Sequence, residues 1–401
     1  MDRWADSPVS LSERQRLVRR SIRDICEGYD RAYWRRKADD GEYPHEFVDD
    51  LAADGWMGLL IPEAYGGAGF DTPEAVVMME EIAASGGGFS AAQAIHGGIY
   101  NSVPLVEYGS EALKTELLPK LASGEQSVQA FCLTEPNAGS DSTAIETTAE
   151  QEGDEWVVNG QKIWISRVDV SDYAVLVART TPKEAVEKRT RGISMFLVDL
   201  DDAVEQGGLT YESIPKSASE FVHSYQVWFD DLRLPESALI GEEGAGFYQV
   251  LDGLNEERLV IAAEAIGLGE LAIERGVAYA NEREVFGRQI GRNQAIQHPL
   301  AEAYAHVQAA KTMVYTAADA VAAGEPGMVG AWANMAKFLA ATAAFEAADA
   351  AVQTHGGFGV ATEYDVERYL REARLTRLVP ITQQLALNYV GETVLGLPRS
   401  Y

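Results

Sequence analysis

The stretch SVQAFCLTEPNAGSD, residues 127–141, marks a change in the pattern of this sequence. It starts as a β-rich run and ends in proline, asparagine, glycine and serine, which favour a tight loop. Before it, apolar residues recur three or four positions apart, as in PEAVVMMEEIAA at 73–84, which is typical of amphipathic helices. After it come short β-rich runs such as YAVLVART at 173–180, and Asn159-Gly160 predicts a hairpin turn between two of them.

Helical periodicity returns after Pro235 and continues almost to the last residue. Four Ala-rich segments are separated by short breaks, which favours an antiparallel four-helix bundle. These segments span residues 257–280, 299–323, 327–353 and 381–396. We therefore predict an α+β multidomain protein, with an N-terminal α-helical domain over 1–127, a middle β-barrel domain over 128–239 and a C-terminal α-helical bundle over 240–401.

The chain of 401 residues carries 62 acidic against 33 basic residues, which gives a formal net charge of −29. This balance argues against binding to nucleic acid or to an anionic membrane surface. The acidic residues are spread along the chain, as expected for a solvated acidic surface. Two origins stay open: adaptation to a high-salt cytoplasm, as in a halophile, and an ordinary acidic enzyme.

The two cysteines, Cys26 and Cys132, are expected to be buried free thiols in a reducing compartment. The first twenty residues lack an apolar signal core, and no run of about 18 uncharged apolar residues occurs. We therefore expect a cytoplasmic protein that does not cross a membrane.

Two polar stretches of the β-rich region could bind a ligand. In FCLTEPNAGSD, the hydroxyls of Thr134 and Ser140 could contact a polar ring edge or a phosphate, although a loop with proline and glycine is more often a plain turn. In QKIWIS at 161–166, Trp164 and Ser166 share one face of a predicted strand and could line a planar cofactor. The alternative is a tryptophan in the core of a barrel.

Two further stretches lie in the helical bundle. NEREVFGRQIGRNQ at 281–294 gathers Arg283, Arg288 and Arg292, whose guanidinium groups could hold a pyrophosphate or could pair with neighbouring glutamates. QTHGGFG at 353–359 has three glycines, which would form a helix C-cap and would also let backbone approach a ligand closely.

Taken in order, these motifs resemble the acyl-CoA dehydrogenase family of flavoproteins. The resemblance runs from about Glu13 to the end and rests on GWMGLLIPEAYGG, FCLTEPNAGSD, NGQKIWIS, ERLVIAA, EREVFGRQIGRNQAIQ and QTHGGFG. It implies FAD as cofactor, an acyl-CoA substrate, a role in fatty acid β-oxidation, and assembly into a homodimer or homotetramer. It also implies that electrons pass to an electron-transfer flavoprotein. No metal, nucleic acid or membrane partner is expected.

The resemblance also implies which residues bind FAD, some of them from a neighbouring subunit. Ser166 stands where many members have threonine. The implied FAD-binding residues are Phe131, Leu133, Thr134, Gly139, Ser140, Trp164, Ser166, Arg283, Phe286, Gln294, Gln353, Gly356, Gly357, Thr382 and Gln384. The implied substrate-binding residues are Ser140, Leu254, Asn255 and Arg258.

The catalytic base is expected at Glu257. Many members of the family carry their catalytic glutamate where this chain has Pro380, and no carboxylate lies between Glu372 and Glu392. A minority, including isovaleryl-CoA and long-chain enzymes, place it directly before an arginine on the first helix of the bundle, and Glu257-Arg258 matches that position. The alternative is a buried structural ion pair between Glu257 and an arginine such as Arg258.

Helical geometry separates Glu257 from its neighbour Glu256. Glu257 shares a face with apolar residues one turn before and one turn after it, whereas Glu256 is rotated by about 100°. We therefore predict that Glu256 faces solvent. The bare backbone of Gly253, one turn earlier, could make room for an acyl chain.

Pro380 also removes a backbone N–H that, in relatives, helps to polarise the thioester carbonyl. Either the Ile381 N–H replaces this donor, or stabilisation of the enolate depends more on a hydroxyl group of the flavin. The expected reaction is α,β-dehydrogenation to a trans-2-enoyl-CoA, with Glu257 taking the α-proton and flavin N5 taking the β-hydride. The alternatives are an acyl-CoA oxidase that uses O₂ and a catalytically silent FAD-binding relative.

Overall fold

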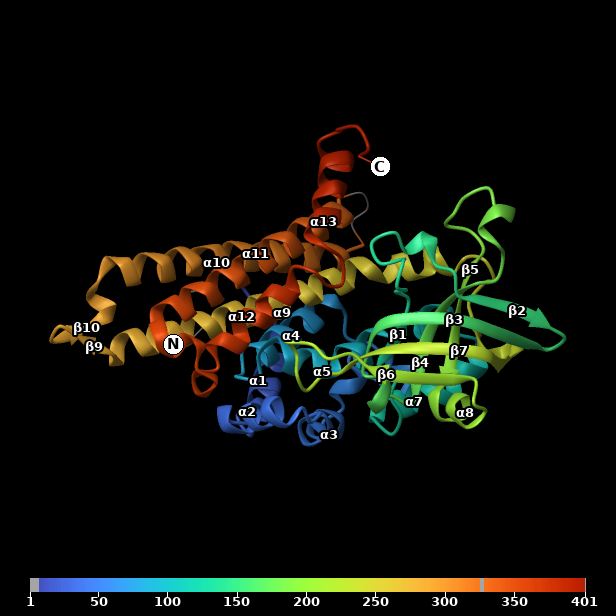
Figure 1. The fold of residues 1–401 in the computed structure, drawn as a ribbon, viewed down its shortest axis with the longest axis horizontal. Coiled ribbons are helices and arrows are strands. Elements are labelled where there is room, and N and C mark those ends of the chain that lie inside the picture. Colours follow the sequence, from blue (N-terminus) through green and yellow to red (C-terminus); the bar gives the residue numbers. More distant parts are fainter. Residues whose placement is uncertain (1–6, 325–327, 401) are drawn as a thin grey trace.

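The computed structural model describes residues 7–324 and 328–400, and it has the predicted order of helices, strands and helices. In Figure 1 the long helices occupy one end of the molecule and the sheet the other, with the N-terminal helices alongside where the two meet. The predicted α+β class, with a helical, a β and a second helical domain in this order, is confirmed. Gly327, the first residue of the third predicted bundle segment, lies outside the described residues.

In the part of the chain that the structure describes, seven α-helices precede the first strand. They are α1 (Glu13–Cys26), α2 (Arg31–Asp40), α3 (His45–Ala53), α4 (Thr72–Ala83), α5 (Gly88–Tyr100), α6 (Val103–Tyr108) and α7 (Glu111–Ser123). The α4 helix starts with a capping box, in which Asp71 and Glu74 satisfy each other's backbone N–H groups. Every residue of α4 is buried, because it packs between α1 and the bundle. Cys26 and Cys132 are both buried and are not joined in a disulfide, as predicted.

The middle region is one eight-stranded sheet. Its strands are β1 (Ala130–Cys132), β2 (Thr148–Glu152), β3 (Glu155–Ser166), β4 (Tyr173–Arg179), β5 (Ile193–Asp199), β6 (Leu209–Ser213), β7 (Ser224–Pro235) and β8 (Leu239–Ile240), with the short helix α8 (Leu200–Glu205) after β5. The strand order is β6-β7-β3-β2-β4-β5-β8, and β1 pairs with β4 in parallel. No pairing between described residues joins β6 to β8, so the sheet does not close into the predicted barrel.

The predicted hairpin at Asn159-Gly160 is wrong, because β3 runs through both residues. Gly160 has a φ of 149° and lies at a register shift between β3 and β7. The glycine therefore allows a bulge-like irregularity inside the strand. The hairpin instead lies between β2 and β3, where Gly153 takes a φ of 69°.

Three long helices form most of the C-terminal region: α9 (Gly246–Glu282), α10 (Gln294–Ala322) and α11 (Val329–His355). Two short strands, β9 (Glu284–Val285) and β10 (Arg288–Gln289), connect α9 to α10. The fourth helix packed on this group is α12 (Val366–Thr376), which the sequence did not predict.

The fourth predicted segment is wrong in its extent. It forms only α13 (Gln383–Tyr389), followed by a π-helical turn, Val390–Val394. Figure 1 shows α13 and the C-terminal residues projecting from the rest of the bundle. Among the described residues, no helix combines the length and the apolar character needed to span a bilayer.

Candidate active site

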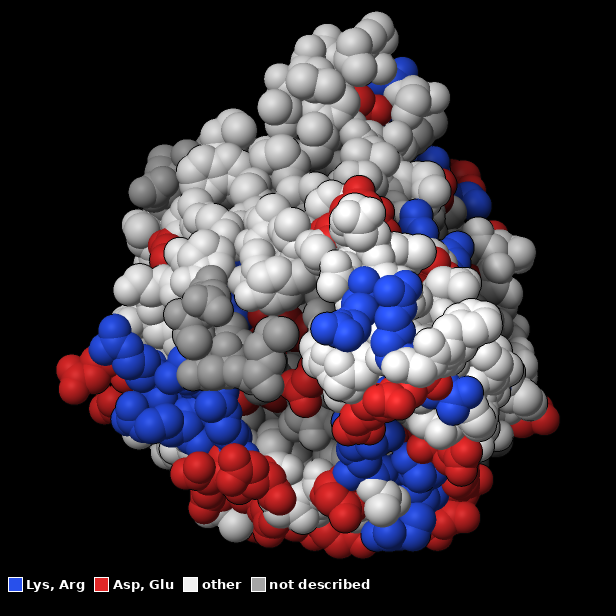
Figure 2. Space-filling model, turned by 90° about the vertical axis from the view of Figure 1, so that its left-hand side faces the viewer, with Lys and Arg blue, Asp and Glu red and all other residues white. Residues whose placement is uncertain are grey.

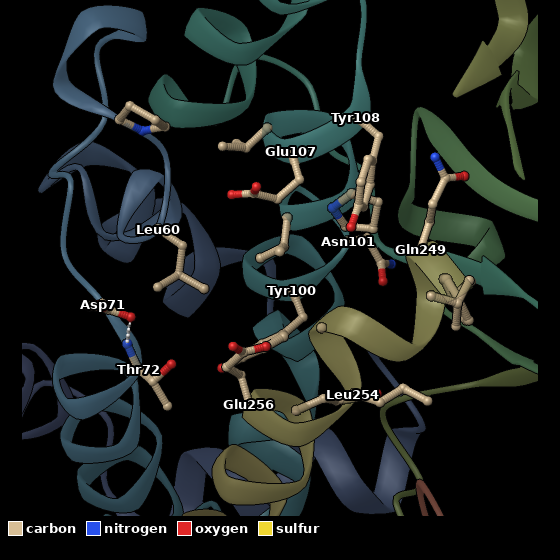
Figure 3. Close-up of a pocket in the computed structure, with 18 of the residues that line it drawn as sticks. Leu60, Asp71, Thr72, Tyr100, Asn101, Glu107, Tyr108, Gln249, Leu254 and Glu256 are labelled. Carbon is tan, nitrogen blue, oxygen red and sulfur yellow. Dashed lines mark hydrogen bonds between the residues drawn. The ribbon is translucent and has the colours of Figure 1, made fainter. Parts of the chain in front are cut away.

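A cavity of about 630 Å³ lies where α4, α5, α6 and β1 meet the first turns of α9. Its apolar walls include Leu60, Phe70, Val103, Val250 and Leu254, and Phe131 of β1 contributes an aromatic face. Figure 3 shows Glu256 of α9 and Tyr100 of α5 in the middle of this cavity, with Asp71 and Thr72 on one side. The cavity could therefore hold an extended, largely apolar group.

Glu257 lines the cavity, with its side chain 26% exposed. Gly253, one turn before it, also lines the cavity, and a Cβ there would come no closer than 3.9 Å to Val103 Cγ1. The prediction that Glu256 faces the outer solvent is wrong, since Glu256 is half-buried and lines the same cavity. The cavity wraps around more of the α9 surface than one helix face.

Behind Glu257 lies His96 of α5, which is buried between two carboxylates. Its Nε2 is 3.7 Å from Oε1 of Glu257. Its Nδ1 is 2.8 Å from Oε1 of Glu264, which is fully buried on α9. Burial alone would lower the pKa of His96, but the charges of Glu264 and Glu257 raise it to about 9. This shift favours the imidazolium form of His96 at neutral pH.

Several buried groups fix this arrangement. Gln93 Nε2 donates to the second oxygen of Glu264 at 2.7 Å, and the Tyr100 ring stacks on His96 with centroids 5.5 Å apart. Arg167, at the end of β3, donates to the Gln93 carbonyl at 2.5 Å. A Cβ on Gly97 would lie 2.2 Å from the Gln129 carbonyl, so glycine permits the close approach of α5 to β1 here.

The sequence did not single out His96, Glu264, Tyr100 or Arg167. Simple features of the sequence could have pointed to two of them, Glu264 and His96. Glu264 interrupts the apolar run IAAEAIG in the middle of a predicted helix, and His96 is one of only six histidines. Their partnership is not readable from the sequence, because they are 168 positions apart.

The residues beside Glu257 face elsewhere. Arg258 Nη1 donates to Asn255 Oδ1 at 2.8 Å, rather than to Glu257, and Asn255 faces Gly330 at the start of α11. Of the predicted substrate-binding residues, Leu254 lines the cavity, whereas Asn255, Arg258 and Ser140 are not among its lining residues.

The Pro380 loop supplies no base. The peptide bond between Val379 and Pro380 is cis, and the next carbonyl, that of Ile381, accepts from Lys337 Nζ at 2.6 Å. Glu372, the nearest preceding carboxylate, is fully buried and is held by Arg368 at 3.0 Å and by Ser90 Oγ at 2.7 Å.

After this loop, Thr382 caps α13 by accepting from the Leu385 N–H, and Gln384 is exposed.

Several of the predicted flavin contacts from the β region lie together. The Ile163 N–H donates to the Thr134 carbonyl at 2.9 Å, which joins the FCLTEPNAGSD loop to the QKIWIS strand. Trp164 has a φ of 63° and is 55% exposed, so its flat ring is not packed in a core. Ser166 Oγ lies 3.4 Å from Ser224 Oγ. An exposed aromatic plane beside hydroxyl groups fits a planar ring system.

Buried ion pairing supports this surface from behind. Lys162 is fully buried and donates to Glu135 Oε1 at 2.8 Å and to the Leu133 carbonyl at 3.0 Å. Glu135 also accepts from the backbone N–H groups of Glu146 and Thr147. Leu133 and Thr134 are thereby held in place, while Gly139 and Ser140 lie further along the same loop, and Ser140 is exposed.

The remaining predicted FAD contacts lie at the far end of the bundle. Arg283, Gly356 and Gly357 line a separate open cavity of about 670 Å³, and the Arg283 guanidinium lies 5.9 Å from the centre of the Phe358 ring. Figure 2 shows lysine and arginine side chains gathered in patches on this end of the molecule, among acidic ones. Phe286 is 100% exposed.

Near this end cavity, Gln294 begins α10 and Gln353 lines a neighbouring hollow with Glu346 and Asp349. A Cβ at Gly356 or Gly357 would meet no atom within 4 Å, so backbone is open to a ligand there. The described chain therefore presents the predicted FAD contacts as two separate surfaces.

Comparison with known proteins decides the family. Three family models match in succession: the N-terminal domain of acyl-CoA dehydrogenase over residues 12–125, the middle domain over 130–232 and the C-terminal domain over 244–395. The chain belongs to the acyl-CoA dehydrogenase family. It is a flavin-dependent oxidoreductase, and FAD is its cofactor.

Individual acyl-CoA dehydrogenases and related structures match over nearly the whole chain. "Acyl-CoA dehydrogenase FadE12" of Mycobacterium tuberculosis is 37% identical over 399 residues, which is 99% of this chain and 100% of that protein. The structure of the glutaryl-coenzyme A dehydrogenase glutaryl-CoA complex is 30% identical, with a TM-score of 0.89 and 98% of each chain covered. A structure described as the electron transferring flavoprotein of Acidaminococcus fermentans is 30% identical, with a TM-score of 0.88, covering 96% of this chain and 99% of that one.

Proposed function

We propose that this acyl-CoA dehydrogenase oxidises an acyl-CoA thioester to the trans-2-enoyl-CoA, with Glu257 as the catalytic base. The observation that carries the proposal is that one cavity has the Glu257 carboxylate on one wall and Phe131, from the predicted flavin surface, on another. The Pro380 loop has no acid to compete for this role.

The α-proton of a thioester is only weakly acidic, so its removal needs a carboxylate held within hydrogen-bond reach of the α-carbon. Glu257 is suited to this because its carboxylate borders the cavity while the acyl chain can lie against Leu254, Val250 and Phe70. Gly253 leaves the chain room beside the base. After the reaction, the α-proton resides on Glu257.

The bound FAD would supply the acceptor for the β-hydride. Thr134, Trp164 and Ser166 would hold its ring, with Phe131 and Leu133 beside it. Thr382 and Gln384 would contribute after the Pro380 loop. Arg283, Phe286, Gln294, Gln353, Gly356 and Gly357 would contact the FAD of a neighbouring copy, because they lie on a different surface from Trp164. The exposed Phe286 ring and the open end cavity support assembly into a homodimer or homotetramer.

We also place the enzyme in the cytoplasm, in fatty acid β-oxidation, with an electron-transfer flavoprotein as acceptor. The choice of acceptor follows from the family resemblance, which implies an electron-transfer flavoprotein. An acyl-CoA oxidase would instead release peroxide when no other acceptor is present. The domain boundaries at residues 127 and 239 belong to the same proposal.

The test is Glu257→Gln, with Glu256→Gln as the matched control on the neighbouring position. We expect Glu257→Gln to bind FAD and to lose at least about 100-fold in the rate of anaerobic flavin bleaching, because the general base is gone. Glu256→Gln should stay within about tenfold of the wild-type protein. Straight, branched and aryl acyl-CoA thioesters would be compared, and bleaching of Glu257→Gln at a near-normal rate would rule out the assignment.

A further inference from the structure

We propose that His96, itself held by Glu264, is a positioning residue that keeps the Glu257 carboxylate turned toward the cavity before substrate binds. The inference rests on the proposed role of Glu257 as base. It concerns three side chains, Glu257, His96 and Glu264, which we call the cavity cluster.

Helix geometry allows one imidazole to serve both acids. Glu257 and Glu264 are seven residues apart on α9, so they lie on the same face about two turns apart. His96 projects from α5 between them, with Nδ1 at 2.8 Å from one carboxylate and Nε2 at 3.7 Å from the other. The two ring nitrogens therefore face two different carboxylates.

Glu264 is the fixed end of the cavity cluster. It is fully buried, and its two oxygens meet His96 Nδ1 and Gln93 Nε2. Gln93 lies one turn before His96 on α5, and its own carbonyl accepts from Arg167. Glu264 can therefore orient the imidazole but cannot reach the cavity, whereas Glu257 is 26% exposed and can.

The charge of His96 decides whether the arrangement works. Only an imidazolium has N–H groups on both nitrogens, so only the charged form can face two carboxylates favourably. The charged and titratable groups that face it are Glu257 and Glu264 from α9 and Tyr100 from α5. Arg167, the residue after β3, interacts electrostatically with the same two glutamates. Burial and the nearby glutamates raise the pKa of Tyr100 well above its usual value, so Tyr100 is neutral.

Turnover requires no proton on His96 to move. Glu257 takes the α-proton and becomes neutral, while His96 stays paired with Glu264. His96 is not among the residues that line the cavity, so its loss should change the rate of proton abstraction more than substrate binding. A misplaced base typically costs on the order of 100-fold in rate.

The experiment measures single-turnover reduction of the bound flavin as a function of pH. The variants are His96→Gln and Glu264→Gln, with His306→Gln as the matched control. His306 forms a comparable pair with Glu346, with Nδ1 to Oε2 at 2.7 Å, but on the exposed surface of α10 and α11.

We expect His96→Gln to lower the rate roughly 10- to 100-fold with KM nearly unchanged. The wild-type rate should decline as the pH rises through about 9, where His96 loses its proton, and His96→Gln should lack this decline. In Glu264→Gln this decline should occur at lower pH, because the carboxylate nearest to His96 is gone, and His306→Gln should match the wild-type protein. If both cavity-cluster variants retain the wild-type pH profile, the inference is overturned, whatever Glu257→Gln does.

A second measurement covers the case in which these variants do not fold. In the wild-type holoenzyme labelled at its six histidines, one imidazole should remain protonated to about pH 9 by nitrogen NMR. If every histidine signal titrates near its ordinary pKa, the inference is overturned. Retained activity of Glu257→Gln, in contrast, would contradict the proposed function itself.

Discussion

Two groups of buried charges on α9 have the same composition, an acid, a cation and a second acid, but only one reaches a cavity. The bundle cluster consists of Glu80 of α4, Lys311 of α10 and Glu270 of α9, and Lys311 Nζ donates to the two carboxylates at 2.7 and 3.0 Å. All three side chains are almost fully buried. In the cavity cluster, by contrast, Glu257 borders open space.

The comparison shows that burial of charge does not by itself indicate chemistry. Tyr315 donates to Glu80 at 2.9 Å and Gln308 donates to Glu270 at 3.1 Å. The hydrogen bonds of the bundle cluster therefore join α4, α9 and α10. The cavity cluster leaves one carboxylate available to a ligand. Access to a cavity, more than desolvation, distinguishes the site that can act on substrate.

The largest expected effect is on the bundle cluster. Lys311→Met would leave Glu80 and Glu270 facing each other without a cation, so we expect a loss of about 3–5 kcal/mol in the free energy of unfolding. Urea denaturation near pH 8 measures this loss. The rate of flavin bleaching by the folded fraction should be unchanged.

A triple variant, Glu80→Gln with Lys311→Met and Glu270→Gln, serves as the control for that measurement. It removes all three charges, so it should recover most of the lost stability. If Lys311→Met instead abolished turnover in fully folded protein, the two clusters would not differ in the way described.

The next effect is the pH dependence of stability that His96 contributes. Its pKa is raised from 6.5 to about 9 in the folded protein, so its contribution is complete below pH 6.5 and is lost as the pH rises through 9. The shift corresponds to roughly 3 kcal/mol at most. The expected signature is an excess of wild-type over His96→Gln stability that shrinks between these two pH values.

That comparison must be made between variants, because other groups titrate in the same range. Burial lowers the pKa of Lys216 and of Lys337 to about 8, which makes the protein more stable as the pH rises. Both lysines are present in wild-type and His96→Gln protein, so their effect cancels in the difference. A difference that is constant with pH would contradict an imidazolium at position 96.

A smaller effect concerns the substrate. The cavity is lined by carboxylates, including Asp71, Glu107 and Glu256, and none of its described lining residues is lysine or arginine. A thioester with a terminal carboxylate, such as glutaryl-CoA, should therefore bleach the flavin at least about tenfold more slowly than a methyl-terminated thioester of equal length. Glu256→Gln should narrow that gap, and equal rates in the wild-type protein would contradict the argument.

The smallest expected effect is at Gly253. An alanine Cβ there would make only ordinary contacts, so Gly253→Ala should stabilise α9 by about 0.5–1 kcal/mol. The added methyl group enters the cavity beside Glu257, so the longest accepted acyl chain should shorten. Thermal denaturation tests the predicted stability, and a series of acyl-CoA thioesters of increasing chain length tests the predicted substrate limit. Unchanged stability would contradict the expectation that an alanine fits at position 253 without strain.

Sequence reasoning found what local pattern can encode. The order of helices and strands and the burial of Cys26 and Cys132 agree with what the local pattern predicts. Phe131, Leu254 and Glu257, which the family resemblance singled out, all line the cavity. It missed the contacts that depend on which distant elements meet. His96 and Glu264 are joined only because α5 packs on α9.

The wrong predictions have the same origin. Asn159-Gly160 has the composition of a turn, but pairing of β3 with β7 extends the strand through it. Glu256 was assigned to solvent from helix geometry alone, and the width of the cavity decides its environment instead. The 381–396 segment has a helical pattern, but α12 takes the packing position on the bundle.

The place of the proposed base on a continuous helix also makes the site transferable to a related chain. Glu257 and Glu264 both belong to one eight-residue segment of α9, and the third member of the cavity cluster is a single residue of α5. A relative with its acid in the loop after the third long helix could therefore be re-engineered by grafting this short segment, one histidine and the proline that replaces the old acid. The catalytic centre would move from loop to helix without any change in the architecture around it.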